Sequence, residues 1–322
     1  MIISRTPCRV SFAGGGTDLR AFYQHEPGAV VGTAIDKYIY ITINKRFDET
    51  IRAGYSKTEI VDDVAQIQHP IIREAMKITG VTSGIEITSI ADLPAGTGMG
   101  TSSSFAVGLL NALYAYKNEH KTAEELARDA VKIEVNILKE PIGKQDQYFA
   151  AYGGLKHFVF NSDETVYVEP IICYEKTRKT LGENLLLFYT GITRNANSVL
   201  KKQKESTEKK MIYLGHMKEM AQNISNALVE NDLSCLGTFL NDGWQSKKQL
   251  VDTISNPVID FYYERGIAAG ASGGKLLGAG NGGFLLFYCT PQNQAKLRNV
   301  LGLREISFSL EPQGSKIIYV GN

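Results

Sequence analysis

One short segment, LPAGTGMGTSSSFAVG at residues 93–108, restricts the possible folds of this chain more than any other. Three glycines stand at alternate positions, Gly96, Gly98 and Gly100, and four hydroxyl residues follow them at 101–104. The strand pattern GIEITSI precedes the segment, and apolar residues at helical spacing follow it. We therefore predict a loop that connects a strand to the first turn of a helix.

A glycine loop that runs into a helix can hold an anion. Glycine lets backbone N–H groups approach a ligand closely, and the first helical turn offers unpaired donors at its positive end. The hydroxyl residues add donors and one possible magnesium ligand. The alternative is a tight strand-to-helix connection with a Ser or Thr cap, which needs only one glycine and one hydroxyl. We predict a phosphate-binding loop, although not a Walker A loop, because no GK[ST] follows.

A second glycine cluster, GAGNGG at residues 278–283, formally matches GxGxxG. It leads into the strand pattern FLLFYC and not into a helix, which disfavours a dinucleotide-dependent oxidoreductase. We expect instead a close backbone approach to another part of the site, with a plain hairpin turn as the alternative. A third cluster, at residues 14–16, has Arg9 and Asp18 beside it.

Two further acidic residues are candidates for chemistry. Residues 122–139 are predicted to form a helix that opens with a Thr122–Glu125 capping box. Glu134 interrupts a row of apolar residues on this helix. If its carboxylate is buried, it must be paired or metal-bound; the alternative is a position at the edge of the buried face, where the side chain reaches water. Asp146 lies past the helix end, between two glutamines whose amides could orient it, and a turn residue is the alternative. Glycine loops beside acids and an arginine suit phosphoryl transfer.

Composition excludes several other classes of protein. A net charge of +1 provides no electrostatic footprint for nucleic acid or an anionic membrane surface. No apolar run approaches the ~20 residues that a membrane span needs, and the first residues do not resemble a signal peptide. The four cysteines are scattered, and no zinc-site spacing occurs. We expect a cytoplasmic protein with free thiols and neither a nucleic-acid nor a membrane partner.

The order of the patterns indicates the fold class. Strand patterns mixed with helical ones predict an α+β protein in two layers, and 322 residues are enough for two domains. We place the boundary near residue 165, which gives domains at 1–165 and 166–322.

Taken together, the three glycine segments resemble motifs of the GHMP small-molecule kinases, named for galactokinase, homoserine kinase, mevalonate kinase and phosphomevalonate kinase. PAGTGMGTSS (94–103) is similar to the family's P-x-G-x-G-L-G-S-S phosphate loop, and KLLGAGNGG (275–283) resembles its third motif. The resemblance implies a two-domain GHMP kinase fold, with an N-terminal mixed sheet and helices and a C-terminal ferredoxin-like α/β sandwich. It also implies ATP and Mg²⁺ as cofactors.

The resemblance assigns roles to individual residues. Ser102 and Glu134 match the magnesium ligands, and Asp146 matches the proposed base, with Arg9 as the basic residue beside it. The implied ATP contacts are Pro94, Gly96, Thr97, Gly98, Met99, Gly100, Thr101, Ser102 and Ser103. The implied or proposed substrate contacts are Gly15, Gly16, Thr17, Asp18, Arg194 and Gly280. Arg194 is proposed to bind a phosphate on the substrate, with Lys156 as a second candidate and a surface arginine as the alternative.

The first motif narrows the substrate. Galactokinases carry Gly-Glu-His-x-Asp where this chain has GGGTD (14–18). RTPCRVSFAGGGTDL, GKQDQY and TGITRNA look closest to kinases of D-glycero-D-manno-heptose 7-phosphate, which implies phosphorylation of the anomeric hydroxyl to a 1,7-bisphosphate for nucleotide-activated heptose. A fucokinase-like or other free-sugar 1-kinase is the alternative, and a catalytically inactive sugar sensor is a further one. Both a monomer and a homodimer are compatible with the sequence.

Overall fold

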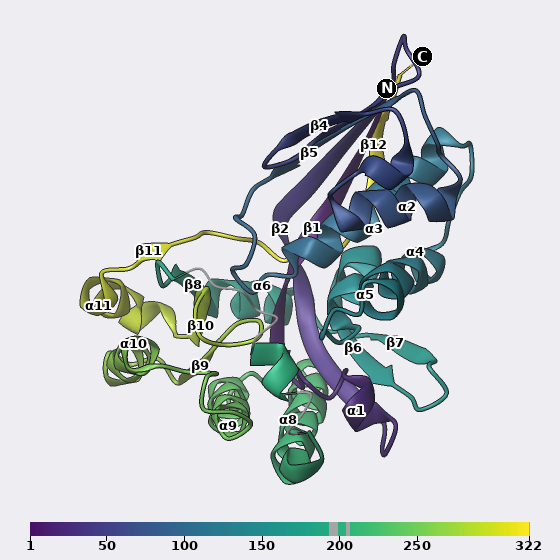
Figure 1. Ribbon diagram of the computed structural model, residues 1–322. Helices are drawn as coiled ribbons and strands as arrows, with labels where there is room; N and C mark the ends of the chain where they lie inside the picture. Colours follow the sequence, from purple (N-terminus) through teal and green to yellow (C-terminus); the bar gives the residue numbers. More distant parts are fainter. Residues whose placement is uncertain (193–198, 204–206, 322) are drawn as a thin grey trace.

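The computed structural model describes residues 1–192, 199–203 and 207–321. Within these residues the strands form two sheets of different size, and helices pack against both of them (Figure 1). The first and last strands are neighbours, with Ile2 opposite Val320, so the two ends of the chain lie side by side.

The larger sheet has, among the described residues, eight strands in the order β12-β1-β2-β5-β3-β4, with β6 beside β2 and β7 beside β6. They are β1 (Ile2–Ala13), β2 (Gly28–Lys45), β3 (Ile51–Gly54), β4 (Thr58–Val61), β5 (Ile85–Ala91), β6 (Leu155–Phe160), β7 (Val166–Pro170) and β12 (Lys316–Val320). The sheet is mixed, because β3 runs parallel to β5 whereas the other pairs are antiparallel.

Helices cover one face of this sheet: α2 (Pro70–Thr79), α3 (Thr101–Tyr116), α4 (Ala123–Val131) and α5 (Gln145–Tyr152) (Figure 1). A short helix, α1 (Arg20–Tyr23), follows β1. α3 contacts β1 and β2 as well as α2, α4 and α5. Its apolar residues therefore occur nearly all round, as in a buried helix. This packing fixes the position of the N-terminus of α3 and of the glycine loop before it.

The helix predicted over 122–139 differs from the prediction in its second half. The capping box is present, with the Thr122 side chain accepting from the Glu125 amide. The α-helix ends at Val131, however, and a π-helical segment covers Lys132–Ile137. Glu134 belongs to this segment, so its position does not follow from α-helical spacing. Such wide turns are rare and occur often at functional sites.

The smaller sheet is antiparallel, in the order β11-β8-β10-β9. Its strands are β8 (Leu185–Tyr189), β9 (Gly273–Leu276), β10 (Phe284–Tyr288) and β11 (Arg304–Glu305). The surrounding helices are α6 (Glu175–Asn184), α8 (Met211–Val229), α9 (Leu236–Lys248), α10 (Pro257–Ala268) and α11 (Pro291–Leu301). Alternate residues of β8 belong to different core clusters: Leu187 lies in a cluster with residues of β1, and Leu186 and Phe188 lie in a cluster with residues of α10.

Two strand assignments refine the sequence-based outline. The segment REISFSL (304–310) has the alternating pattern of a strand, but its strand covers just Arg304–Glu305, which pair with β8. β7 and β12, both beyond residue 165, pair with strands of the larger sheet. The division of the chain at residue 165 stays a prediction. Among the described residues, no helix combines the length and the apolar character required to cross a membrane.

Candidate active site

A cavity of about 380 Å³ lies where four segments distant in sequence meet. These are the glycine turn after β1, the glycine loop before α3, the first turn of α5 and the glycine cluster after β9. The first three belong to the larger sheet and its helices, and the fourth belongs to the smaller sheet. Predicted site residues that line the cavity are Arg9, Gly15, Gly16, Asp18, Gly96, Gly98, Gly100, Thr101, Ser102, Ser103, Glu134 and Asp146.

The loop before α3 has the backbone conformation that its glycines permit. The φ angles of Gly96, Gly98 and Gly100 are 75°, 80° and 74°, where a side chain would be strained. A Cβ atom on Gly98 would also lie 2.6 Å from the carbonyl oxygen of Leu277. A Cβ atom on Gly278 would lie 2.4 Å from the Cα atom of Gly98. The two glycine clusters therefore meet backbone to backbone, as predicted.

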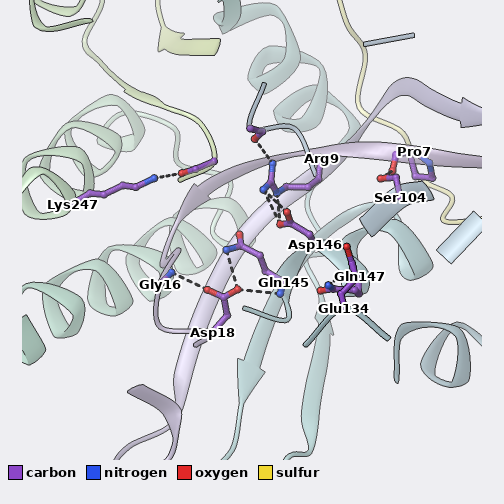
Figure 2. Close-up of polar contacts among 12 residues, drawn as sticks. Pro7, Arg9, Gly16, Asp18, Ser104, Glu134, Gln145, Asp146, Gln147 and Lys247 are labelled. Carbon is purple, nitrogen blue, oxygen red and sulfur yellow. Dashed lines mark hydrogen bonds and ion pairs between the residues drawn. The ribbon is translucent and has the colours of Figure 1, made fainter. Parts of the chain in front are cut away.

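The first turn of α3 forms part of the cavity wall. Gly100 precedes it without a side-chain cap, so the first amides of the helix have no intrahelical acceptor. Thr101, Ser102 and Ser103 line the cavity at this turn. Ser104, in contrast, donates to the Pro7 carbonyl oxygen at 2.7 Å and anchors α3 to β1 (Figure 2). A helix N-terminus of this kind suits a phosphate group.

Arg9 and Asp146 form a two-pronged ion pair at the centre of the site (Figure 2). Nε of Arg9 donates to Oδ1 of Asp146 and Nη2 donates to Oδ2, both at 2.8 Å. Nη1 of Arg9 donates to the Gly98 carbonyl oxygen at 2.6 Å. The Arg9 side chain is 5% exposed, whereas that of Asp146 is 25% exposed. The planar guanidinium thus fixes the orientation of a carboxylate that a ligand can still reach.

Asp18 is a second carboxylate in the cavity wall, and it is buried. It accepts hydrogen bonds from the Gly16 amide at 2.8 Å and from N and Nε2 of Gln145 at 3.1 Å each. Burial raises the pKa of Asp18, and the hydrogen bonds oppose this shift. The Oε1 atom of Gln145 is buried and has no hydrogen-bond partner among the described residues. These oxygens are acceptors suited to hydroxyl groups, the polar groups of a sugar.

Glu134 lies beside the first turn of α3 and is 1% exposed. Ser102 Oγ donates to its Oε1 at 2.9 Å, and Gln147 Nε2 donates to its Oε2 at 2.6 Å. Burial raises the pKa of Glu134 to about 7. Its recorded hydrogen-bond partners are uncharged, which leaves the ionised form without a nearby cation among the described residues. A buried carboxylate next to a hydroxyl fits Mg²⁺, which prefers oxygen ligands.

The two glutamines beside Asp146 do not orient it, which corrects the sequence-based expectation. Gln145 binds Asp18, and Gln147 binds Glu134 (Figure 2). These residues begin α5, where successive side chains point about 100° apart, so neighbours in sequence cannot share one target. The first turn of α5 consequently serves three carboxylates: its own Asp146, which pairs with Arg9, and the two that the glutamines hold.

Some predicted residues contact the protein backbone and not the cavity. Thr17 is buried, and its hydroxyl donates to the carbonyl oxygens of residues 14 and 29. The Thr97 hydroxyl donates to the Pro94 carbonyl oxygen at 2.8 Å. Met99 is buried in the core, where its carbonyl oxygen accepts from the Arg9 amide. In the described structure these four residues shape the loops that line the cavity.

Other predicted contacts lie elsewhere. Gly280 packs against the backbone of Ile254, while its neighbours Gly278 and Ala279 line the cavity. Lys156 lies on β6 and is absent from the cavity wall in the part of the chain that the structure describes. Arg194 lies outside the described residues. The substrate contacts proposed for Gly280 and Arg194 stay predictions.

Sequence reasoning missed two buried lysines in the cavity wall. Lys247 lies in the last turn of α9, and Lys275 lies on β9. Lys275 opens the third motif quoted above, which is a signal that could have found it. Lys247 is one of several charged residues on a mixed helix, and nothing in its local sequence distinguishes it.

The chain is similar to known proteins over most of its length. The family model for the GHMP kinases N terminal domain matches residues 64–154, and that for the GHMP kinases C terminal matches residues 224–303. A D-glycero-alpha-D-manno-heptose 7-phosphate kinase of Campylobacter jejuni is 30% identical over 317 residues, 93% of this chain and 93% of that protein. A bifunctional fucokinase/GDP-fucose pyrophosphorylase of Arabidopsis thaliana is 26% identical over 90% of this chain and 30% of that protein. The crystal structure of a D-glycero-D-manno-heptose 1-phosphate kinase from Bacteroides thetaiotaomicron has a TM-score of 0.84 at 23% identity and covers 100% of both chains.

A two-sheet α+β fold with a glycine loop at a buried helix N-terminus, beside carboxylates, is that of a small-molecule phosphotransferase. The family models and the identity to the Campylobacter enzyme agree with this class. The chain belongs to the GHMP kinases. The predicted fold class, the predicted kinase class and the resemblance to this family are thereby confirmed.

Proposed function

We propose that this GHMP kinase transfers the γ-phosphoryl group of ATP to the anomeric hydroxyl of D-glycero-D-manno-heptose 7-phosphate. The observation that carries the proposal is the Asp146 carboxylate, which Arg9 holds in a cavity between two glycine loops. Asp18 and Gln145 supply acceptors for sugar hydroxyls in the same cavity. The 30% identity to a heptose 7-phosphate kinase over nearly the full length of both chains supports this sugar phosphate. The product would be a 1,7-bisphosphate, used to make nucleotide-activated heptose.

In the proposed reaction an oxygen of Asp146 accepts the proton of the anomeric hydroxyl. The hydroxyl oxygen forms a bond to the γ-phosphorus while the bond from this phosphorus to the β–γ bridging oxygen breaks, which releases ADP. A loose phosphoryl transition state requires little activation of the nucleophile, so much of the rate enhancement comes from positioning the reacting groups. Arg9 contributes by keeping the Asp146 carboxylate in one orientation.

The nucleotide phosphates would lie against the glycine loop and the first turn of α3, where no described side chain caps the backbone amides. Ser102 and Glu134 would hold Mg²⁺ there. When bound, the ion supplies positive charge that neutralises the phosphate oxygens. Within the described residues no three His, Cys, Asp or Glu side chains lie close enough together to hold a metal ion by themselves. A magnesium site completed by phosphates and water needs just one or two protein oxygens.

A panel of acceptors with ATP and Mg²⁺ tests the proposal. The acceptors are D-glycero-D-manno-heptose 7-phosphate, the unphosphorylated heptose, L-fucose and D-galactose, with Asp146→Asn as the inactive control. Product mass shows whether one phosphate is added, and coupling between phosphorus and the anomeric proton in NMR spectra shows where. We expect the highest kcat/KM for the heptose 7-phosphate.

Two other results would replace this proposal. Preference for an unphosphorylated sugar would indicate the fucokinase-like alternative. Sugar binding without turnover of any acceptor would indicate an inactive sensor. The proposed enzyme is a cytoplasmic monomer or homodimer that acts on a small molecule, and its mass in solution distinguishes these two states.

A further inference from the structure

Two lysines at one side of the cavity bind to main-chain carbonyl groups. Lys247, in the last turn of α9, donates to the Gly278 carbonyl oxygen, and Lys275, on β9, donates to the Phe12 carbonyl oxygen at 2.9 Å. Each residue is 5% exposed. Both side chains line the cavity, so they are buried from bulk water but remain next to the space that a substrate would fill.

Lys275 is a buried lysine that lies near two other cationic side chains, Lys247 and Arg9. Burial and the positive charges of Lys247 and Arg9 lower the pKa of Lys275 well below its usual value. Arg9 is balanced by Asp146, but no carboxylate lies within ion-pair distance of Lys275 in the described part of the chain. Burying a cation is costly unless an anion accompanies it. A bound dianion would supply the missing charge and would favour the protonated form of the lysine.

The carboxylates and the lysines of the cavity wall come from different parts of the chain. The carboxylates, among the described residues, come from the N-terminal half of the chain, and both lysines come from the part that carries the smaller sheet. In Figure 2 Lys247 reaches in from α9 on one side of the Arg9–Asp146 pair, and Glu134 lies on the opposite side. If Glu134 marks the metal end of the nucleotide phosphates and Asp146 the reacting hydroxyl, then Lys247 lies across the Arg9–Asp146 pair from Glu134, next to Gly278, where the glycine cluster after β9 meets Gly98.

We propose that Lys247 and Lys275 bind the phosphate monoester that the sugar already carries before the transfer. The proposal rests on the proposed function and deepens it, because it assigns the second anion site that a sugar phosphate requires. Lysine ammonium groups donate hydrogen bonds to phosphate oxygens, and a partly desolvated site strengthens each of them. The site differs from Arg194 and Lys156, the cations considered from the sequence.

The test compares Lys247→Met with Lys248→Met. Lys248 is the next residue of α9 and carries the same charge, but it contacts Asp260 and the Trp244 ring and does not line the cavity in the described structure. KM is measured for the heptose 7-phosphate and for ATP, and KM or Ki for the unphosphorylated heptose. Lys275→Met provides a second, independent variant, and thermal unfolding shows whether each variant is folded.

We expect Lys247→Met to raise KM for the heptose 7-phosphate ~10- to 100-fold, the size expected for losing a charged hydrogen bond. The constants for ATP and for the free heptose should change less than about twofold, and Lys248→Met should match wild type. A parallel rise for free and phosphorylated sugar, or a larger rise for ATP, would overturn the assignment while the proposed function stands. Failure of the wild-type protein to phosphorylate the heptose 7-phosphate would instead remove the proposed function itself.

Discussion

Replacing Glu134 by glutamine should stabilise the metal-free protein above neutral pH. Glu134 is 1% exposed, and burial raises its pKa from the usual 4.5 to about 7. Between these pH values the folded state keeps a proton that the unfolded state has lost, so the free energy of unfolding falls as pH rises. A shift of one pKa unit corresponds to 1.36 kcal/mol, so ionisation of Glu134 lowers the free energy of unfolding by about 3 kcal/mol by pH 8.

Glutamine removes the ionisation and can keep both hydrogen bonds, with Oε1 accepting from Gln147 and Nε2 donating to the Ser102 hydroxyl oxygen. The variant should therefore gain up to about 3 kcal/mol at pH 8 and almost nothing near pH 4.5. With about 2.1 cal/mol/K of unfolding entropy for each of 322 residues, this gain raises Tm by about 4 °C. Saturating Mg²⁺ and ATP should reduce or reverse this difference in Tm. Bound Mg²⁺ offsets the negative charge of Glu134 in the wild type, whereas the variant has no charge there to offset.

The measurement is thermal unfolding of wild type and Glu134→Gln from pH 4.5 to 8, with and without Mg²⁺ and ATP. Glu219→Gln is the matched control, because this glutamate lies exposed on α8. The control should follow the wild type at every pH. Parallel pH curves for wild type and Glu134→Gln, or a less stable variant at pH 8, would refute the reasoning that a buried, ionised carboxylate costs stability here.

Three other predictions concern the same cavity. Ser102→Ala should raise the Mg²⁺ concentration needed for half-maximal turnover about tenfold, which a magnesium titration measures, and should lower Tm only slightly through the lost hydrogen bond to Glu134. Asp146→Asn should lower kcat at least ~10²-fold if it removes a general base; a drop of a few-fold at unchanged KM would mean that Asp146 merely orients the hydroxyl. Gly98→Ala should lower Tm and weaken ATP binding, because its Cβ atom would lie 2.6 Å from the Leu277 carbonyl oxygen. Gly191→Ala has a similar φ of 76°, but no atom of the described residues lies within 4 Å of the added Cβ atom, so it should cost just the backbone strain of about 1 kcal/mol. Equal losses in both variants would contradict the role of the contact.

The sequence by itself determined the features that residues a few positions apart encode. Glycines at 96, 98 and 100 permit the positive φ angles of this loop, and the helix that follows is encoded by its own apolar spacing. The capping box from Thr122 to Glu125 is equally local. The resemblance to the GHMP motifs then predicted that the three glycine segments form one site, and it identified the family without knowledge of any contact between these segments.

Tertiary structure alone decided which partner each polar side chain meets. Arg9 pairs with Asp146 across 137 residues, and Asp18 binds Gln145 across 127. The sequence could not separate the targets of Gln145 and Gln147, because the direction of a side chain depends on where α5 begins and how it packs. The π-helical turn at Glu134 could not be predicted for the same reason, since it too depends on packing. Lys247 lines the cavity because α9 packs beside β9. Short-range spacing sets backbone conformation, whereas long-range packing sets the distances, burial and charge that make a site.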